Sequence, residues 1–583
     1  MASIHFPRRR KNILGGIFVV VCLYWVLQQQ ALFKDQLKTK IVNNSCLQAL
    51  ARLEKRPGRW PTVPEPSGRI GDDVIEKLLD LRDYEKCVMS NAALDSERLK
   101  LIHKGLFPYL NLDLLYEDEK KFWPVHSRWD GQVVQGFTPR FSDDGYKFIG
   151  FSKIKYDQGL SFWENWLRNI MQPGSRGIVI SAGTRQLEDC ARLVKVLRHL
   201  GNKLPIEIVH RGDLSLEEQR RIFQISTEEA SSDFPAQDLW FLDVSSMLNP
   251  VYADSFKSFS NKWLAVVFST FQNPILLDAD TIPFTSLDIY YKSHQFQTTG
   301  AVFFKDRRVN SDILDNDQLS TLKRIFFNLT GITLVENESN ESVRDKLKAS
   351  FKDDIAVEIV YNMIVKGEKH HMESGLVLID KRQHLVNILA SIALQFSSIS
   401  DYFHGDKEWF WIAQALQGQP FTFHPKGASN VGKLGSVISD EKGEFYQLCS
   451  VQLSHTDIDG SLLWVNGGLR TCKKDSWASD YRNNKRISSM FDSEEAVRKY
   501  YQSPIQLEAA IIPDTDIKPW IMTGECAMFT YCTLYKEGEF GEVIKFNQAQ
   551  KNAYREIVRV WNSAIHSIED PSSVLEISDP RAQ

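Results

Sequence analysis

The chain has 583 residues and a formal net charge of -4, from 70 Lys and Arg against 74 Asp and Glu. Its 43% hydrophobic and 25% charged residues, with a mean hydropathy of -0.29, are typical of a soluble globular protein. These averages exclude a multispan membrane protein, a disordered chain and a fibrous repeat. The near-neutral charge also argues against nucleic acid as a partner, because no global basic field is present.

The first 33 residues depart from these averages. An uncharged apolar run over 13–27 follows the basic residues 8–11, and the uncharged stretch continues to residue 33. The run alone is short for a membrane span, which usually needs about 17 to 25 residues. The longer stretch suits a tilted helix, and no small-x-small cleavage site follows it. We therefore expect a cytoplasmic tail over 1–12 and an uncleaved signal anchor over 13–33, with the remainder lumenal. A cleaved signal peptide is the alternative.

Four N-x-Ser/Thr sequons agree with a lumenal placement. They begin at Asn43, Asn328, Asn337 and Asn340. The last three lie in one polar stretch, which we expect to be a surface loop that carries N-linked glycans.

The cysteines agree with an oxidising compartment but do not pair off evenly. Of the eight Cys, one lies in the predicted span and seven follow it. An odd number leaves at least one Cys free or paired between chains. Cys526 with Cys532 is a candidate local bridge, and buried free thiols are expected for the rest.

Beyond the anchor the chain divides into four stretches. Residues 34–71 are Pro-rich and stem-like, and residues 72–172 are predicted to form a helical, aromatic N-terminal subdomain. Over 173–470 apolar strand patterns alternate with helical ones, which predicts an α/β domain with a mainly parallel sheet. Residues 471–583 form a C-terminal extension with an amphipathic helix near 547–565.

The order of elements in the α/β stretch is that of a nucleotide-binding sheet. We expect strands over 177–183, 206–210 and 274–280, with helices over 186–200 and 257–271. Ligands of such sheets bind at the carboxyl ends of the strands.

Two short motifs lie at those strand ends. Gly183 and Thr184 follow the first strand, and Asp278 and Asp280 end the segment PILLDAD. Two carboxylates one residue apart at a strand end can hold a hard divalent cation through oxygen. Such a cation bridges a diphosphate and neutralises the charge of a leaving group. A helix cap or a strand-end turn is the alternative.

The D-x-D spacing by itself is weak evidence, because the chain has other such pairs. We expect these to be turn or loop carboxylates: Asp315 with Asp317, Asp457 with Asp459, and Asp514 with Asp516. The sequence has no G-x-x-x-x-G-K-[ST], G-x-G-x-x-G, H-E-x-x-H or G-x-S-x-G motif. This argues against a Walker NTPase, a dinucleotide oxidoreductase, a zincin and an α/β-hydrolase.

Seven segments, in this order, resemble the fungal Golgi α-1,3-mannosyltransferase family: GIVISAG, LPIEIVHRGD, PILLDADTIPF, TGAVFFKDR, HHMESGLVLIDK, GDKEWFWIA and QLSHTDIDGSLLWVNGG. The resemblance covers about half of the chain, over 177–468, together with the plan of anchor and stem. A sister group of α-1,2-mannosyltransferases shares the LLDAD, ESG and GDKE elements, so the linkage is less firmly indicated than the family.

The resemblance implies a type II Golgi membrane enzyme with a glycosyltransferase A-type fold. It implies GDP-mannose as donor, Mn²⁺ as cofactor, retention of the anomeric configuration and mannose-terminated N- or O-linked glycans as acceptors. Other mannosyltransferases are possible partners. In this reading Asp278 and Asp280 hold the metal, and His455 is a candidate third ligand in a late loop, although its spacing departs from that of similar enzymes. A solvated loop histidine is the alternative.

The same resemblance points to Glu373, Gly375 and Asp406. Glu373 is a candidate to contact the donor mannose or the acceptor, or to act as a nucleophile. Gly375 would let the sugar approach the backbone closely. Asp406 either faces the anomeric carbon or caps the helix that follows it.

Several neighbouring residues are expected to be structural. We expect the aromatic residues 409–411 to pack in the core, since consecutive helical side chains point in different directions. His370 and His371 are expected to be strand-entry residues, and Lys262 a surface charge that could reach the nucleotide.

Two other functional classes remain open. A catalytically inactive lectin or scaffold subunit would keep the fold while losing a carboxylate, and Asp278, Asp280, Glu373 and Asp406 are all present. A metal-dependent phosphohydrolase would also use paired carboxylates. It would hydrolyse the sugar nucleotide without transfer to an acceptor.

Overall fold

The protein was analysed as a computed structural model. It describes residues 45–56, 69–89, 94–231, 234–309, 313–334, 338–435, 438–440 and 443–563. The predicted tail and anchor, most of the stem, Asn43 and Asn337 lie outside these residues. Among the residues that are described, no helix is both long and apolar enough to span a bilayer.

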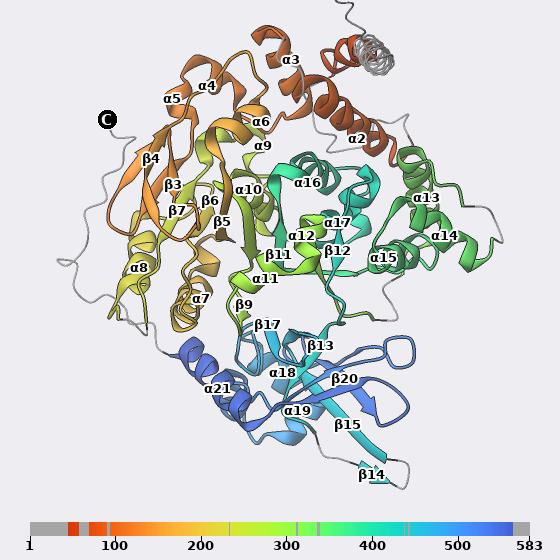
Figure 1. Cartoon of the computed structure of the whole chain (residues 1–583). Coiled ribbons are helices and arrows are strands. Elements are labelled where there is room, and N and C mark those ends of the chain that lie inside the picture. Colours follow the sequence, from red (N-terminus) through yellow and green to blue (C-terminus); the bar gives the residue numbers. More distant parts are fainter. Residues whose placement is uncertain are drawn as a thin grey trace, which may run out of the picture.

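A nine-stranded mixed sheet forms the centre of the described chain (Figure 1). In spatial order its strands are β12 (Thr422–Phe423), β10 (Ala301–Lys305), β11 (Met372–Ile379), β8 (Phe271–Leu277), β5 (Gln172–Ser181), β6 (Ile206–His210), β7 (Leu239–Asp243), β1 (Val125–Arg128) and β2 (Val133–Gln135). Neighbours among β8, β5, β6 and β7 are parallel, whereas β11 and β1 join them antiparallel. The predicted α/β class is confirmed, but the sheet is parallel mainly at its centre.

The central strands are buried on both faces, which is why they appear in the sequence as continuous apolar runs. Every residue of β6 and β7 is buried. Helices α7 (Leu187–His199) and α8 (Leu216–Thr227) belong to one hydrophobic core, while α10 (Asn261–Phe268), α16 (Lys381–Gln395) and α17 (Lys407–Gln417) belong to the other.

The N-terminal region is helical mainly in its first half, with one further short helix, α6 (Phe162–Asn165), near its end. Helices α2 (Asp72–Tyr84), α3 (Ser96–Leu106), α4 (Leu112–Glu117) and α5 (Glu119–Phe122) agree with the prediction. The following strands β1, β2, β3 (Phe137–Phe141) and β4 (Phe148–Lys153) do not. Packing accounts for this difference: the rings of Phe148 and Phe151 lie 5.1 and 5.8 Å from that of Trp240 on β7, a contact that local periodicity does not reveal.

A second, six-stranded sheet lies below the first in Figure 1. Its strands, in spatial order, are β21 (Glu542–Lys545), β18 (Ala509–Ile512), β13 (Ser429–Gly432), β16 (Leu453–Thr456), β17 (Leu462–Asn466) and β9 (Thr281–Pro283). Strands from both sides of residue 470 therefore share one sheet. Because β9 begins directly after Asp280, the D-x-D segment stands at the junction of the two sheets.

The C-terminal region adds a four-stranded sheet and several helices. The sheet has the order β14 (Ile438–Asp440), β15 (Gly443–Ser450), β20 (Tyr531–Lys536) and β19 (Ile521–Met522). The helices are α18 (Trp477–Asn483), α19 (Lys485–Met490), α20 (Glu494–Gln502) and α21 (Gln548–Asn562). The last of these confirms the predicted amphipathic helix.

Three disulfides join distant parts of the described chain: Cys46–Cys87, Cys449–Cys532 and Cys472–Cys526. The predicted Cys526–Cys532 bridge is wrong. Cys532 on β20 lies directly opposite Cys449 on β15 in the antiparallel ladder, and this register decides its partner. Cys190 is the buried free thiol of the described residues, as expected for an odd number of cysteines. The expectation of free thiols is wrong for Cys46, Cys87, Cys449 and Cys472, which are all disulfide-bonded.

The two sequons within the described residues lie on helices rather than in a loop. Asn328 is exposed on α13 (Asn316–Thr330), and Asn340 is the exposed first residue of α14 (Asn340–Ser350). Both amide side chains are accessible, although the loop prediction is wrong at these two positions.

Candidate active site

The carboxyl ends of β5 and β6 bring together residues of two loops. The Thr184 hydroxyl, after β5, donates a hydrogen bond of 3.0 Å to the carbonyl oxygen of Asp213, after β6. A Cβ atom at Gly183 would lie 2.7 Å from the Asp213 carboxylate. Gly183 thus allows Asp213 to approach the end of β5. Asp213 was not among the residues predicted from the sequence, although it is the third residue after strand 206–210.

A buried lysine organises the end of β8. Lys262 lies at the start of α10, and its Nζ is 2.8 and 2.9 Å from the two carboxylate oxygens of Asp278. The same Nζ is 3.3 Å from Asp406 Oδ2 and donates a hydrogen bond of 2.9 Å to Ser374 Oγ. The expectation of a surface charge is therefore wrong, since Lys262 is only 7% exposed.

Burial and neighbouring charges shift the pKa values of Lys262 and Asp278. Burial alone would lower the pKa of Lys262, but the carboxylates of Asp278 and Asp406 outweigh it and raise that pKa. Burial raises the pKa of Asp278 to about 7, with Lys262 acting in the opposite direction and Asp280 and Asp406 adding to the increase. Lys262 is thus a permanent cation between two carboxylates.

Asp406 occupies the N-cap position of α17 without capping it. Its side chain accepts no hydrogen bond from the first turn of the helix. The carboxylate is 2% exposed and points to Lys262. Of the two predicted roles, the cap is therefore wrong, and the structure places Asp406 beside Asp278.

The ESG segment lies on β11, next to β8. One oxygen of Glu373 accepts hydrogen bonds from the Gly375 N–H at 3.0 Å and from Asn466 Nδ2 at 2.9 Å. A Cβ atom at Gly375 would lie 2.6 Å from Thr281 Oγ1 and 3.0 Å from the ring of Trp464. The space over Gly375 is filled by the second sheet, so the glycine is needed for protein packing. The approach of a sugar at Gly375 stays a prediction.

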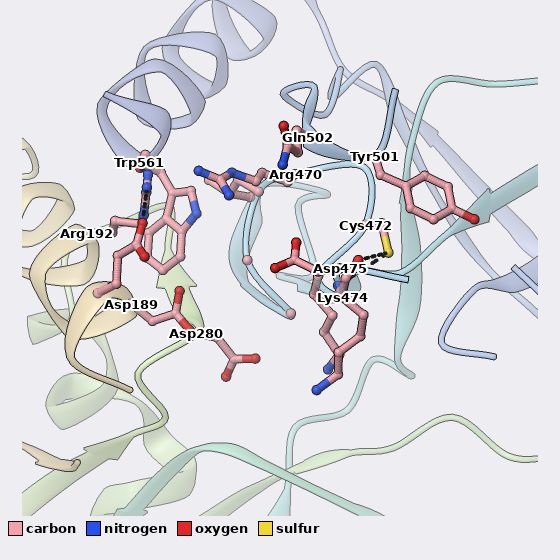
Figure 2. A pocket seen from close by; sticks show the side chains of 15 residues that line it. Asp189, Arg192, Asp280, Arg470, Cys472, Lys474, Asp475, Tyr501, Gln502 and Trp561 are labelled. Atoms are coloured by element: carbon pink, nitrogen blue, oxygen red, sulfur yellow. Dashed lines mark hydrogen bonds and ion pairs between the residues drawn. The ribbon is translucent and has the colours of Figure 1, made fainter. Parts of the chain in front are cut away.

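Asp280 faces a different environment from Asp278. It lines a cavity of about 220 Å³ together with Asp189, Arg470, Lys473 and Lys474. Figure 2 shows Asp189 and Asp280 on one wall of this cavity and Lys474 on the other. Burial and the charge of Asp280 raise the pKa of Asp189 to about 6. Carboxylates and ammonium groups thus meet around one cavity.

His455 does not join the aspartates. It lies on β16 rather than in a loop, and it is fully buried. Its ring packs 4.3 Å from that of Trp464 and 5.0 Å from that of Phe304. Burial lowers the pKa of His455 well below its usual value. The structure therefore surrounds His455 with aromatic side chains, and the loop expectation is wrong.

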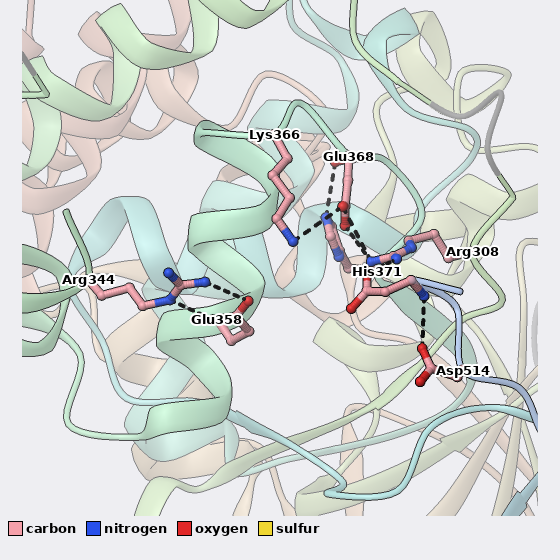
Figure 3. Close-up of polar contacts among 8 residues, drawn as sticks. Arg308, Arg344, Glu358, Lys366, Glu368, His371 and Asp514 are labelled. Carbon is pink, nitrogen blue, oxygen red and sulfur yellow. Dashed lines mark hydrogen bonds and ion pairs between the residues drawn. The ribbon is translucent and has the colours of Figure 1, made fainter. Parts of the chain in front are cut away.

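The strand-entry residues before Glu373 are held by a polar cluster (Figure 3). His371 Nε2 lies 3.0 Å from the carbonyl oxygen of Glu368, and burial lowers the pKa of His371 to about 4. The ring is therefore neutral near pH 7 and donates to that carbonyl. Arg308 bridges the Glu368 carboxylate at 3.2 Å and Asp516. The structural role expected for His371 is confirmed.

The carboxylate set matches a hard divalent cation only in part. Asp280 opens on the cavity, but both oxygens of Asp278 contact Lys262. In the described parts of the chain, no three His, Cys, Asp or Glu side chains converge on a point that would suit a metal ion. Mg²⁺-type sites often use one or two carboxylates plus substrate phosphate oxygens. Asp280 suits that kind of site, whereas both oxygens of Asp278 already contact Lys262.

Comparisons with known proteins identify the family of the chain. A family model described as a putative mannosyltransferase matches residues 175–457. The α-1,3-mannosyltransferase MNT2 of Saccharomyces cerevisiae is 47% identical over 494 residues, which cover 85% of this chain and 87% of that protein. The probable α-1,3-mannosyltransferase MNT4 of the same yeast is 40% identical over 568 residues, covering 97% of this chain and 94% of that protein.

The chain belongs to this mannosyltransferase family. A solved structure that overlaps with it is the mannosyltransferase Ktr4p from S. cerevisiae in complex with GDP, at 12% identity and a TM-score of 0.27. That overlap covers 41% of this chain and 66% of the other, and it carries no argument about the site of this mannosyltransferase.

The aromatic residues beside the site behave as the sequence predicts for a core. Trp409, Phe410 and Trp411 of α17 are at most 1% exposed. They pack behind Asp406 and leave no ring face open to a sugar. In this mannosyltransferase the cavity beside Asp280 and the ion-pair group around Lys262 are formed by polar side chains near the D-x-D segment, not by these rings.

Proposed function

We propose that this mannosyltransferase is a retaining enzyme that transfers mannose from GDP-mannose to form an α-1,3 linkage on mannose-terminated N- or O-linked glycans. The observation that carries the proposal is the position of the D-x-D segment. Asp278 belongs to a buried group with Asp406, while Asp280 opens on a cavity lined by Lys473 and Lys474. The names of the yeast relatives support the α-1,3 linkage.

The fold supports the donor class. Parallel strands β5, β6 and β8 end at one edge, where nucleotides bind in sheets of this kind. We propose a glycosyltransferase A-type arrangement in which Gly183, Thr184 and Asp213 contact the nucleoside. Asp278 and Asp280 would hold Mn²⁺, which when bound neutralises the charge of the departing diphosphate.

The remaining carboxylates are proposed to face the donor mannose. Asp406 is held beside Lys262, which fixes its direction. Glu373 is fixed through one oxygen by Asn466 and retains the other for a sugar hydroxyl or for the anomeric carbon. Their variants distinguish these roles, because a nucleophile cannot be replaced by an amide, whereas a hydrogen-bonding carboxylate tolerates one in part.

We also propose that the enzyme is a single-pass type II protein of the Golgi membrane with its catalytic part in the lumen. The three disulfides support an oxidising compartment. The exposed Asn328 and Asn340 support glycan attachment. Endoglycosidase treatment of the protein expressed in yeast should lower its apparent mass, and Asn328→Gln and Asn340→Gln should each remove part of that shift. Release of the protein by alkaline carbonate would argue against the membrane anchor.

The decisive experiment is a transfer assay with linkage analysis. Detergent-purified full-length protein, with GDP-mannose and Mn²⁺, should extend an α-mannobiose acceptor by an α-1,3-linked mannose. Chelation of the metal or Asp280→Asn should abolish this activity. Asp459→Asn is the matched control, because Asp459 belongs to a D-x-D pair in an exposed turn, and it should leave the rate unchanged.

Each alternative function predicts a different result in this assay. An α-1,2-linked product would show that the protein is an α-1,2-mannosyltransferase, like the members of the sister group. Release of free mannose or mannose phosphate without transfer would indicate a hydrolase. Acceptor binding without turnover would indicate a lectin or scaffold. Full activity of Asp280→Asn would contradict the proposed metal site.

A further inference from the structure

The loop after β17 is tied to the backbone of Asp280. The N–H groups of Gly467 and Gly468 both donate hydrogen bonds of 3.1 Å to the Asp280 carbonyl oxygen. Both glycines have positive φ angles, 99° and 73°, which side-chain-bearing residues rarely adopt. The loop therefore leaves β17 directly at the D-x-D segment. Any side chain that follows closely is brought to the cavity that Asp280 lines.

Two lysines of this loop enter the cavity. Lys473 and Lys474 both line it, and the stem of Lys473 lies 3.8 Å from where a Cβ atom of Gly467 would stand. Figure 2 shows the side chain of Lys474 reaching toward the region that Asp280 faces. Within the described residues neither ammonium group forms an ion pair. Both are thus available to an anion.

An aromatic ring holds the two ammonium groups together. Lys473 Nζ and Lys474 Nζ lie 4.7 and 5.2 Å from the centre of the Phe529 ring. A ring face attracts cations without neutralising them. It keeps two like charges side by side, which mutual repulsion would otherwise separate.

A disulfide braces the loop and the ring against each other. Cys472, directly before the two lysines, is bonded to Cys526, three residues before Phe529. The residues Cys526, Ala527 and Met528 have φ angles of 52°, 52° and 69°. Three successive residues other than glycine in the left-handed region are uncommon and persist only where the surroundings enforce them.

Buried polar contacts supply that enforcement. The Tyr501 hydroxyl donates to Asp480 at 2.7 Å and accepts a hydrogen bond of 3.2 Å from the Cys526 N–H. The Asp480 carboxylate also accepts from the Ala527 N–H at 3.2 Å. The segment that carries Phe529 is therefore fixed from two sides, by the disulfide and by the Asp480 carboxylate.

We propose that Lys473 and Lys474 bind the diphosphate of the sugar nucleotide, and that Phe529 and the Cys472–Cys526 disulfide position them for it. The identity of the ligand as a nucleoside diphosphate rests on the proposed function. The chemistry itself follows from two free ammonium groups opposite the carboxylate of Asp280: cations bind phosphate oxygens as point charges, and a carboxylate-bound metal would bind the same diphosphate from the other wall.

GDP binding to the full-length protein in detergent, measured by calorimetry with Mn²⁺ present, tests this proposal. Replacement of both lysines by Met should raise the GDP dissociation constant at least tenfold. Replacement of both by Arg should restore most of the affinity, since the charge is kept. Lys100→Met is the matched control, because Lys100 Nζ lies 5.0 Å from the Tyr116 ring far along the sequence from the cavity, and it should bind GDP as the wild type does.

The positioning role of Phe529 and of the Cys472–Cys526 disulfide is tested with the same measurement. Phe529→Leu should weaken GDP binding about threefold and raise the KM for GDP-mannose more than it lowers kcat, whereas Phe529→Tyr keeps the ring and the affinity. Cys472→Ser with Cys526→Ser should weaken binding about tenfold, while Cys46→Ser with Cys87→Ser, which opens a different disulfide, should not.

The outcomes separate the two proposals. Wild-type protein that does not bind GDP would overturn both of them. If the wild type binds GDP, Asp280→Asn loses it, and the double Met variant stays within twofold of the wild type, the lysine assignment is wrong while the proposed function stands. If the double Met variant loses GDP but Phe529→Leu and the paired Ser variant do not, the positioning role is wrong.

Discussion

Asp278 and Asp280 are two residues apart, yet they face two different electrostatic environments. Asp278 belongs to a buried group in which Lys262, from the helix before β8, supplies the counter-charge. Asp280 faces an open cavity whose free cations, Lys473 and Lys474, come from a loop of the C-terminal region. One motif is thus served by two parts of the chain.

The difference suggests a division of labour within the site. The buried group is complete within the central sheet and the helices packed on it, and it holds Asp406 in place without any ligand. The cavity is lined by side chains of both signs, with Asp189 and Asp280 facing a loop that carries Lys473, Lys474 and Asp475, so it offers groups for a metal and for a phosphate. The buried group around Lys262 fixes the position of Asp406, and the cavity that Asp280 lines provides binding energy for a charged donor.

The largest expected effect is that of Asp406→Asn on turnover. The change keeps the shape but removes a carboxylate that is 2% exposed beside Lys262. We expect kcat to fall about 10³-fold, which corresponds to about 4 kcal/mol. Because Lys262 keeps Asp278 as a counter-charge, the midpoint of thermal unfolding should fall less than it does for Lys262→Met. A rate within tenfold of the wild type would remove Asp406 from the reacting centre.

Lys262→Met should mainly affect stability. It leaves Asp278 and Asp406 as buried carboxylates without their cation, and breaking a buried pair in this way typically costs about 3 kcal/mol of unfolding free energy. Urea unfolding measures the loss. The exposed Lys292 provides the control, because Lys292→Met should change the unfolding free energy by less than about 0.5 kcal/mol. Equal losses for both variants would mean that the buried group is not a structural unit.

Much of the first region could be predicted from the sequence. Continuous apolar runs give β5, β6 and β8, and the small or acidic residues at their ends locate Gly183, Thr184, Asp278 and Asp280. Local sequence patterns do not predict the environment of a side chain when that environment is formed by residues far away in the sequence. Nothing in the sequence around Lys262 shows that two carboxylates from other elements surround it.

The second region could not be predicted, because it depends on contacts between segments far apart in the chain. Lys473 and Lys474 lie more than 190 residues after Asp280, and they reach it through the hydrogen bonds of Gly467 and Gly468. The pairing of Cys472 with Cys526 follows from the same tertiary arrangement. Sequence spacing favoured Cys532 instead, since it is nearer along the chain.

Gly375→Ala tests whether the ESG glycine serves packing or sugar binding. The added Cβ would lie 2.6 Å from Thr281 Oγ1 and 3.0 Å from the Trp464 ring, so the second sheet must move. We expect a loss of about 2 kcal/mol in unfolding free energy, typical of overpacking. Gly159→Ala, in an exposed loop, is the control. Unchanged stability with a raised KM for GDP-mannose would restore the sugar contact inferred from the sequence.

The smallest expected effect concerns Glu408, a buried carboxylate that differs from Asp278 in making hydrogen bonds but no ion pair within the described residues. Its oxygens accept from the Met372 N–H at 3.1 Å and from Trp411 Nε1 at 2.6 Å. Burial raises the pKa of Glu408 to about 7. The folded state therefore holds this proton more tightly than the unfolded state does.

The sign of the pH dependence follows from that shift. The contribution of Glu408 to stability is complete below pH of about 4.5, where both states are protonated, and is lost as the pH rises toward about 7. Glu408→Gln cannot ionise, so the difference in unfolding free energy between wild type and variant should move by about 1 to 2 kcal/mol in favour of the variant between pH 5 and pH 8. Urea unfolding at the two pH values measures this, with the exposed Glu341→Gln as control. Parallel pH profiles for wild type and Glu408→Gln would show that hydrogen bonds alone keep Glu408 ionised, and that a buried carboxylate of this protein needs no lysine.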